Sequence, residues 1–338
     1  MTLPGAVKQV GTSNSTQYAL LAGGSVYAWG LGTQGQLGDG GERNSFTKAV
    51  RVRFPAGVRI AYIPTDAMPY DTGLAVDTHG HAWGWGRNRG GELCRDRGRI
   101  FTTPVRVPLA GRVTTLAGAS NHALYDAGGT VYACGQNVAG DLGDGSMRSS
   151  ATPVKVARLG GTHVTKLVAS FANSGALLAD GEYLDWGYDA NGQLGDGHFG
   201  QSSDVPVKVN LPAPVTEVAQ GGSLWNNGQT VVLLSDGSLW SWGAGRFFQL
   251  GTRVRGARAN PVRFRAPAGV TFHHLATGSA TSYAIAADGK VYAWGVGQLG
   301  QVGNGRTQAV REPVVVASGA VGISSTANNV AISVQPPA

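Results

Sequence analysis

Two glycine-rich stretches of the chain have the spacing of a dinucleotide-binding loop. Residues 30–35 and 295–300 both read Gly-x-Gly-x-x-Gly, and both follow an apolar, aromatic run that predicts a β-strand. A pyrophosphate site of this kind needs a helix N-terminus directly after the glycines. Here both stretches continue into Gln-Leu-Gly or Gln-Val-Gly, which predicts a turn. We therefore interpret both as loops and expect no bound cofactor.

The other reactive residue types show no pattern of a reaction centre. The seven histidines lack the spacing of zinc ligands. The recurrent Gly-Asp-Gly segments lack the further carboxylates that a calcium ion needs, and no Gly-x-Ser-x-Gly nucleophile motif occurs. His122 is interpreted as a hydrogen-bonded structural imidazole. We therefore expect no metal, no catalytic residue and no enzymatic activity.

The glycines belong to a repeat of about 50 residues that organises the whole chain. The stretch Val26 to Gly30, which reads Val-Tyr-Ala-Trp-Gly and is followed by Gly-Gln-Leu-Gly, has five further copies. The positions equivalent to Trp29 follow one another at intervals of 49–56 residues and are Trp85, Cys134, Trp186, Trp242 and Trp294. A fixed period of this length, with strand and turn residues in each unit, indicates a propeller or a solenoid.

Each repeat reads as four β-strands, and no segment has a helical period. A short apolar strand is followed by a second strand, a tight turn such as Asp180-Gly181 and the Tyr-Ala-Trp-Gly strand. The fourth strand is expected to follow a proline in five repeats, at Pro104, Pro153, Pro206, Pro261 and Pro313. The fourth strand alternates Lys or Arg with apolar residues in five repeats, so much of the net charge of +7 would protect an outermost edge from pairing. The recurrent tryptophans, Trp29 and Trp294 included, are predicted to fill the core between neighbouring sheets.

These motifs together resemble the repeats of the regulator of chromosome condensation family, over about residues 5–316. The resemblance implies an all-β propeller of about seven blades, each a four-stranded antiparallel sheet. The last blade would be incomplete or closed by the N-terminus, and a six-bladed ring is the alternative. We predict one domain over residues 1–338. Its repeats are expected at about 5–56, 57–110, 111–160, 161–212, 213–266, 267–317 and, in part, 318–338.

The two cysteines occupy special positions of neighbouring repeats. Cys134 stands where other repeats have tryptophan, and Cys94 stands at the last glycine of the Gly-Gln-Leu-Gly motif. Two cysteines do not make a disulfide framework, so we expect buried free thiols. A single bridge between adjacent repeats is the alternative.

Binding residues are expected in the loops between the first and second strands, which vary in length among the repeats. These loops should emerge on one face of the ring around its central opening, and variable loops on a rigid scaffold commonly bind partners. Aromatic and methionine side chains are enriched at protein interfaces. The predicted partner-binding residues are Asp66, Met68, Tyr70, Phe171, Asn173, Trp225 and Asn226.

The sequence therefore favours a non-enzymatic, monomeric propeller that binds a protein through one face. The short repeats are similar to those of bacterial secreted members of the family, which include a propeller-type β-lactamase inhibitory protein. The resemblance implies a secreted inhibitor or interaction module. Residues 1–11 lack the features of a signal peptide, so a cytoplasmic location is the alternative. No apolar run is long enough to span a membrane.

Two other functions stay open at this point. A small-ligand or enzymatic site could form at the central opening if Asp66, Asp71, Asn121, Asn173 and Asn226 converge there. Acidic polymers could bind the arginine-rich stretches at 87–99 and 246–258. Nucleic acid is not expected, because no recognition helix or row of exposed stacking aromatics accompanies these arginines.

Overall fold

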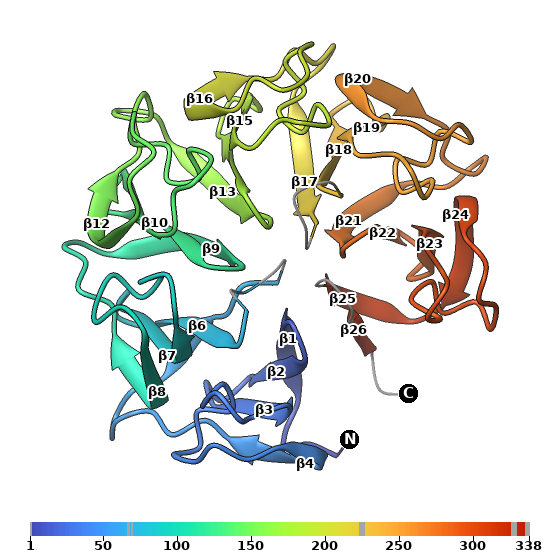
Figure 1. Ribbon diagram of the computed structural model, residues 1–338. Helices are drawn as coiled ribbons and strands as arrows, with labels where there is room; N and C mark the ends of the chain where they lie inside the picture. The colour runs from blue at the N-terminus through green and yellow to red at the C-terminus, as the bar shows by residue number, and fades with distance from the viewer. Residues whose placement is uncertain (1, 66–67, 69, 223–226, 326–329, 335–338) are drawn as a thin grey trace.

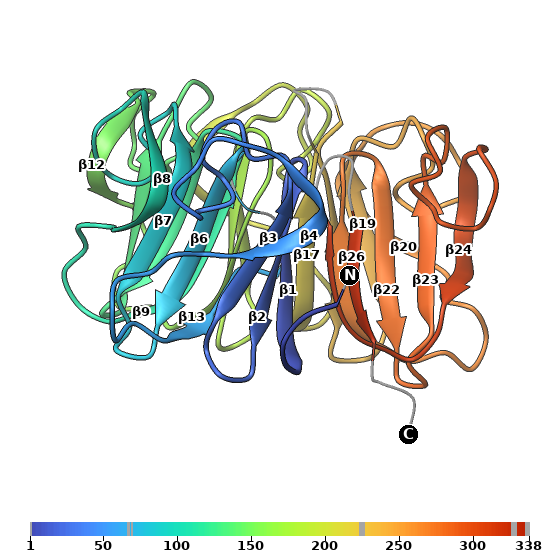
Figure 2. The ribbon, with the colours of Figure 1, turned by 90° about the horizontal axis from the view of Figure 1, so that it is seen from below.

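The chain folds into a ring of antiparallel β-sheets arranged like the blades of a propeller (Figure 1). The computed structural model describes residues 2–65, 68, 70–222, 227–325 and 330–334. All regular elements among these residues are strands, which run between the two faces of the ring (Figure 2). None of the described segments is a helix that could span a membrane.

Six blades have four strands each, and each blade is formed by consecutive strands. Blade 1 contains β1 (Val7–Ser13), β2 (Thr16–Leu21), β3 (Val26–Gly30) and β4 (Ser45–Arg51). Blade 2 contains β5 (Ile60–Tyr62), β6 (Thr72–Asp77), β7 (Ala82–Asn88) and β8 (Arg99–Arg106). Blade 3 contains β9 (Val113–Ala119), β10 (His122–Ala127), β11 (Thr130–Gly135) and β12 (Ser150–Lys155).

The second half of the chain repeats this arrangement. Blade 4 contains β13 (Val164–Ala169), β14 (Asn173–Leu178), β15 (Tyr183–Gly187) and β16 (Ser203–Lys208). Blade 5 contains β17 (Val215–Gly221), β18 (Gln229–Leu234), β19 (Leu239–Gly243) and β20 (Arg258–Phe264). Blade 6 contains β21 (Phe272–Thr277), β22 (Thr281–Ala286), β23 (Val291–Gly295) and β24 (Val310–Ala317). A two-stranded sheet, blade 7, contains β25 (Ala320–Ser325) and β26 (Val330–Val334).

The predicted propeller is confirmed, with six complete blades and a short final sheet. In each complete blade the strands lie in chain order, from the innermost first strand to the outermost fourth strand. The N-terminal strand β1 pairs with β2 and not with blade 7. The ring closes by packing of β25 and β26 against β1, where the Thr12 and Ser324 hydroxyl oxygens lie 3.0 Å apart. The N-terminus therefore closes the ring without completing the last sheet.

The recurrent tryptophans fill the space between blades, as predicted, at four positions. Trp85, Trp186, Trp242 and Trp294 are fully buried. Each indole donates to a main-chain carbonyl in the Gly-Gln-Leu-Gly loop of the preceding blade; Trp85 Nε1, for example, lies 2.9 Å from the Gln36 oxygen. Trp29 differs from this prediction, because it is only half-buried at the border with blade 7. A complete preceding blade is therefore needed to bury this position.

The expectation of free thiols is wrong, because Cys94 and Cys134 form a disulfide with a Cα–Cα distance of 5.2 Å. In other repeats the glycine equivalent to Cys94 lies against the tryptophan equivalent to Cys134. A Cβ atom placed on Gly143, for example, would lie 2.6 Å from Trp186. The disulfide between blades 2 and 3 thus replaces a glycine–tryptophan contact, and the two unusual residues compensate for each other.

The fourth strands form the outer edges of the complete blades. Five of them carry a lysine or arginine between or after apolar residues, and β24 carries Arg311 before its valines. Five prolines were expected to precede these strands. Instead each lies inside its strand, as Pro104 does within β8. Proline has no amide hydrogen to donate, and an outermost strand has one edge that needs no donor.

Candidate functional site

The loops between first and second strands share one face with the long loops between third and fourth strands. Main-chain hydrogen bonds join the two sets within a blade. Arg87 donates to Asp71, Gln136 to Asn121, and Tyr188 to Ala172, each at 2.9 Å. We call this side of the ring the loop face. The prediction that the variable loops emerge together around the ring centre is therefore consistent with the topology.

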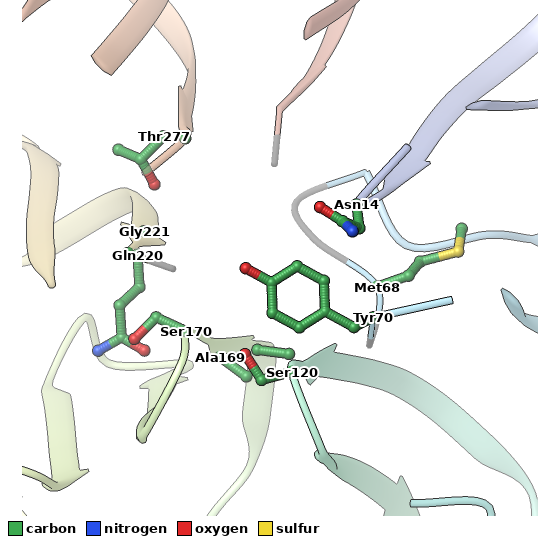
Figure 3. Close-up of a pocket in the computed structure, with 12 residues that line it drawn as sticks. Asn14, Met68, Tyr70, Ser120, Ala169, Ser170, Gln220, Gly221 and Thr277 are labelled. Carbon is green, nitrogen blue, oxygen red and sulfur yellow. The ribbon is translucent and has the colours of Figure 1, made fainter. Parts of the chain in front are cut away.

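A shallow hollow lies at the centre of the ring on this face (Figure 3). It encloses about 350 Å³, including its open mouth. All six complete blades contribute side chains to its wall, which are Asn14, Tyr70, Ser120, Ser170, Gln220 and Thr277. The ring of Tyr70 projects into the hollow, whereas the other five side chains are smaller or lie along the wall.

Tyr70 belongs to the extra segment that lengthens the loop of blade 2. Its amide donates to the Ser120 carbonyl of blade 3 at 3.1 Å, and the amide of Met68 donates to the Thr12 carbonyl of blade 1 at 3.0 Å. The Met68 side chain is 2% exposed and packs near Gly11 and Ile63. The loop thus bridges blades 1 and 3. Met68 anchors it, and Tyr70 is left half-exposed.

Asp71 follows Tyr70 but turns away from the hollow. Its carboxylate accepts a hydrogen bond from Gln36 Nε2 at 3.2 Å and lies 3.7 Å from the Arg87 guanidinium. Its main chain has φ of 58°, a left-handed conformation that fixes the direction of the loop. Burial raises the pKa of Asp71, with Arg87 and Gln36 opposing the effect. Asp71 therefore supports the loop that carries Tyr70.

The equivalent loop of blade 4 holds Phe171 and Asn173. Asn173 is 3% exposed, and its Nδ2 donates to the Tyr188 carbonyl at 2.6 Å, so its amide closes the loop from within. Phe171 is half-buried at the loop face. His122 in blade 3 is buried, with Nε2 at 2.9 Å from the Ser174 hydroxyl, and burial lowers its pKa to about 4. These contacts fit the interpretation of His122 as a structural imidazole.

The predicted partner-binding residues thus fall into three groups. Tyr70 and Phe171 present aromatic rings at the loop face. Met68 and Asn173 are buried and hold their loops in place. Asp66, Trp225 and Asn226 lie outside the described residues.

The residues expected for a small-ligand site do not converge in the part of the chain that the structure describes. Asp71 is bound by Gln36 of blade 1 and lies beside Arg87, Asn173 binds the Tyr188 carbonyl, and none of the described residues that line the hollow is a carboxylate. Among the described residues there is also no group of three or more metal-binding side chains. Asp185 was not identified from the sequence; it is a fully buried carboxylate behind the hollow, and its two oxygens accept hydrogen bonds from Gln220 Nε2 at 2.9 and 3.0 Å. Burial raises the pKa of Asp185 well above its usual value.

The two arginine-rich stretches have different surroundings. In blade 2, Arg87 faces Asp71, while Arg95 and Arg99 lie within 3.7 Å of Asp96. In blade 5, two guanidinium groups lie over the ring of Phe248. They belong to Arg255 and to Arg311 of β24, at 4.8 and 5.1 Å from the ring centroid. Within the described structure neither of these two arginines has an acidic partner, although Arg253 beside them pairs with Glu312.

The fold and its sixfold loop motif define a β-propeller built from internal repeats. The chain belongs to the regulator of chromosome condensation (RCC1) repeat family, whose profile matches residues 23–63, 128–176, 180–224, 236–285 and 288–330. The matched segments leave out residues 64–127. This stretch contains the lengthened loop of blade 2, its arginines and Cys94.

Similar proteins have diverse roles and often greater length. The ultraviolet-B receptor UVR8 of Arabidopsis thaliana is 28% identical over 299 residues, which cover 87% of this chain and 66% of UVR8. The human E3 ubiquitin-protein ligase HERC2 is 27% identical over 317 residues, which cover 90% of this chain and 6% of HERC2. The chain therefore spans less than two thirds of either relative.

Two solved structures have the same fold. Human WBSCR16 superposes with a TM-score of 0.87 at 20% identity, covering 98% of this chain and 87% of that protein. Prp20p of Saccharomyces cerevisiae, which binds Gsp1p and histones, superposes with a TM-score of 0.81 at 22% identity, covering 97% and 82%. The TM-scores show that the fold is the same, and at these low sequence identities the likeness shows the fold alone.

Proposed function

We propose that this propeller is a non-enzymatic binding module that recognises a protein through its loop face. The observation that carries the proposal is the placement of Tyr70. Its ring stands half-exposed in the central hollow on a loop that is fixed to two other blades. An aromatic ring held in place before binding loses little conformational entropy on contact, which suits an interface anchor. Phe171 supplies a second aromatic ring on the same face.

The relatives support a protein partner. Prp20p binds Gsp1p and histones, and it has also been crystallised with Kap60. Prp20p shares the fold at 22% identity, and the family profile does not match residues 64–127, so we take from this protein the kind of ligand and not its identity. The described residues that line the hollow include no carboxylate, histidine, lysine or arginine, which favours the same conclusion because general acid–base catalysis needs such groups.

The proposal is tested with a Tyr70→Ala, Phe171→Ala double variant. A partner is first captured on the wild-type protein from the native source, and its affinity is then measured by calorimetry. We expect the double variant to bind at least about fivefold more weakly, since truncation of an aromatic anchor usually costs more than 1 kcal/mol.

Phe46→Ala is the matched control, because Phe46 is a phenylalanine that is 64% exposed on the outermost strand β4 and is not among the residues that line the central hollow. Equal affinities of the wild type and the double variant would contradict the proposed surface. Trp225→Ala, made in the same series, tests the predicted contribution of a residue outside the described part of the chain.

We further propose that the protein is a bacterial secreted inhibitor or interaction module. The disulfide between Cys94 and Cys134 supports an oxidising compartment, because structural disulfides are rare where thiols are kept reduced. Thiol alkylation of the unfolded protein, isolated from culture medium and from cell extract, tests this location. Recovery of the protein only inside cells, with two alkylated cysteines, would contradict it.

A second candidate function is the binding of an acidic polymer. It is favoured by Arg255 and Arg311, which lie over one phenylalanine ring without a described acidic partner. A polymer held by these charges should lose affinity steeply as salt rises. Titration with polyglutamate at several salt concentrations, with Arg51→Ala as a control for an exposed arginine on β4, distinguishes this function from binding at the loop face.

A further inference from the structure

Blade 7 has an outer edge that differs from every other second strand of the ring. In blades 2 to 6 each residue of the second strand is buried, because a third strand covers it. β26 is the second strand of blade 7, and none of its residues is fully buried. Among the described residues, β26 pairs only with β25. Its backbone edge and its apolar residues Val330 and Ile332 therefore lack the cover that all equivalent strands have.

Blade 6 presents an open position beside this edge. At other interfaces a Cβ atom placed on Gly38, Gly143 or Gly195 would lie 2.6–2.8 Å from the tryptophan of the next blade. The equivalent glycine of blade 6 is Gly303, where the nearest atom to such a Cβ is 3.9 Å away, in Val316 of the same blade. The adjacent carbonyl of Gln301 accepts the Tyr283 hydroxyl at 2.6 Å, and no described indole donates to it. There is therefore room for an aromatic ring here.

Blade 1 shows the complementary feature on the other side of blade 7. Trp29 is half-buried, and no described carbonyl accepts its Nε1–H group. The four equivalent tryptophans are buried and donate to a loop of the preceding blade. In blades 1 to 6 that loop joins the third and fourth strands, and the described residues of blade 7 include neither strand. Two added strands and the loop between them would therefore supply both the aromatic ring against Gly303 and the carbonyl that accepts the Trp29 Nε1–H group.

We propose that this seam, made of the β26 edge, Gln301 to Gly303 and Trp29, binds a β-hairpin of a second polypeptide. The first strand of the hairpin adds to β26 by main-chain pairing and places an aromatic side chain against Gly303. Its loop then offers a carbonyl to Trp29. Strand addition to an exposed edge is a common mode of peptide recognition, in which side-chain pockets provide the specificity. The six complete blades show the chemistry of the occupant. Each has a third and a fourth strand, and the third strand carries a tryptophan or, in blade 3, Cys134.

The proposal is tested with a labelled peptide that copies residues 288–317, the third and fourth strands of blade 6. Fluorescence anisotropy with the full chain should show saturable binding. A peptide with Trp294→Ala should bind at least about tenfold more weakly, because the indole would anchor the strand. Hydrogen exchange should show protection of Val330–Val334 when the wild-type peptide is bound.

Two glycine variants of the protein provide the matched pair. Gly303→Leu places a side chain in the open position, whereas Gly305→Leu does so two residues away. Both glycines have a left-handed backbone, with φ of 78° and 72°, and neither has an atom within 3.5 Å of an added Cβ. The strain of substitution should therefore be similar. We expect Gly303→Leu to abolish peptide binding and Gly305→Leu to retain it.

Urea melts of both variants confirm that folded protein is compared. Absence of saturable binding to the wild type would overturn the proposal, and so would equal binding by the two variants or by the two peptides. Sedimentation of the free protein as a dimer that Gly303→Leu dissociates would show that the occupant is a second copy of the chain, which would overturn the proposed partner. If Gly303→Leu does not fold, the peptide pair and the exchange of β26 amides decide the question.

Discussion

At the scale of single residues, one position of the repeat explains two of the buried acids of this protein, Glu92 and Asp141. The glutamine of Gly-Gln-Leu-Gly turns back and accepts a main-chain hydrogen bond within its own loop, as Gln36 does from Gln34 at 2.7 Å. Blades 2 and 3 have Glu92 and Asp141 at this position, and both accept the equivalent bond. Burial raises the pKa of each to about 7. These shifted acids are therefore substitutions in a structural position and not signs of a reaction centre.

We predict that Glu92→Gln stabilises the protein increasingly as pH rises from about 5 to 8. The folded-state pKa of about 7 lies above the ordinary value of 4.5, so the folded protein holds this proton more tightly than the unfolded chain. Stability is thus lost as pH rises through this range. A shift of this size corresponds to roughly 3 kcal/mol at pH 8. Urea melts at pH 5 and 8 measure the difference in free energy of unfolding between the variant and the wild type. A difference that does not change with pH would contradict the raised pKa of Glu92.

At the scale of elements, the third strand and the loop after it form the joint between blades. The strand supplies a tryptophan, and the loop of the preceding blade supplies the carbonyl that binds it. The disulfide is a chemical variant of the same joint, with Cys94 at the loop position and Cys134 at the strand position. Each joint therefore needs matching residues from two repeats.

We predict that Trp294→Ala and Trp29→Ala differ in stability although the two residues are equivalent in sequence. Trp294 is fully buried, and its loss should cost roughly 3–5 kcal/mol. Trp29 is half-buried and has no described acceptor for its indole, so its loss should cost about 1–2 kcal/mol. The free energy of unfolding in urea measures both. Equal losses would show that the border with blade 7 is packed as tightly as the joint between blades 5 and 6.

At the scale of the whole molecule, the ring is held by contacts between each blade and its neighbours, and blade 7 is the exception. Its two strands pack against β1 and β21 and so close the ring, but among the described residues its outer edge is a second strand and not a fourth strand as in the complete blades. The central hollow and the seam are formed by different residues, and their occupants can be tested independently.

We predict that reduction of the disulfide destabilises the whole ring while the fold persists. The bridge joins positions separated by 40 residues, and it restricts the unfolded chain over that length. The entropic account gives a loss of roughly 2–4 kcal/mol on reduction. Urea melts with and without reductant measure it, and a Cys94→Ser, Cys134→Ser variant that does not respond to reductant is the control. An unchanged midpoint for the wild type would contradict the prediction.

Much of the fold could be predicted from the sequence, because the repeat shows the same local pattern six times. Alternating apolar residues, turn glycines and the tryptophan of the third strand each predict a strand or a turn, and their repetition predicts a ring. Less of the site was predictable. The type of loop and the aromatic residues Tyr70 and Phe171 could be identified, whereas Asp185 could not, since a single aspartate in a strand gives no sign of its burial.

The sequence by itself thus determined the repeat, the strand order and the residues that depart from the repeat, because these depend on contacts between residues close in the chain. Only the tertiary structure decided which departures meet. It joined Cys94 to Cys134, buried Met68 beneath the loop that carries Tyr70, and left Trp29 half-covered beside a two-stranded sheet. Each of these outcomes depends on the packing of segments from different blades, which no local pattern specifies.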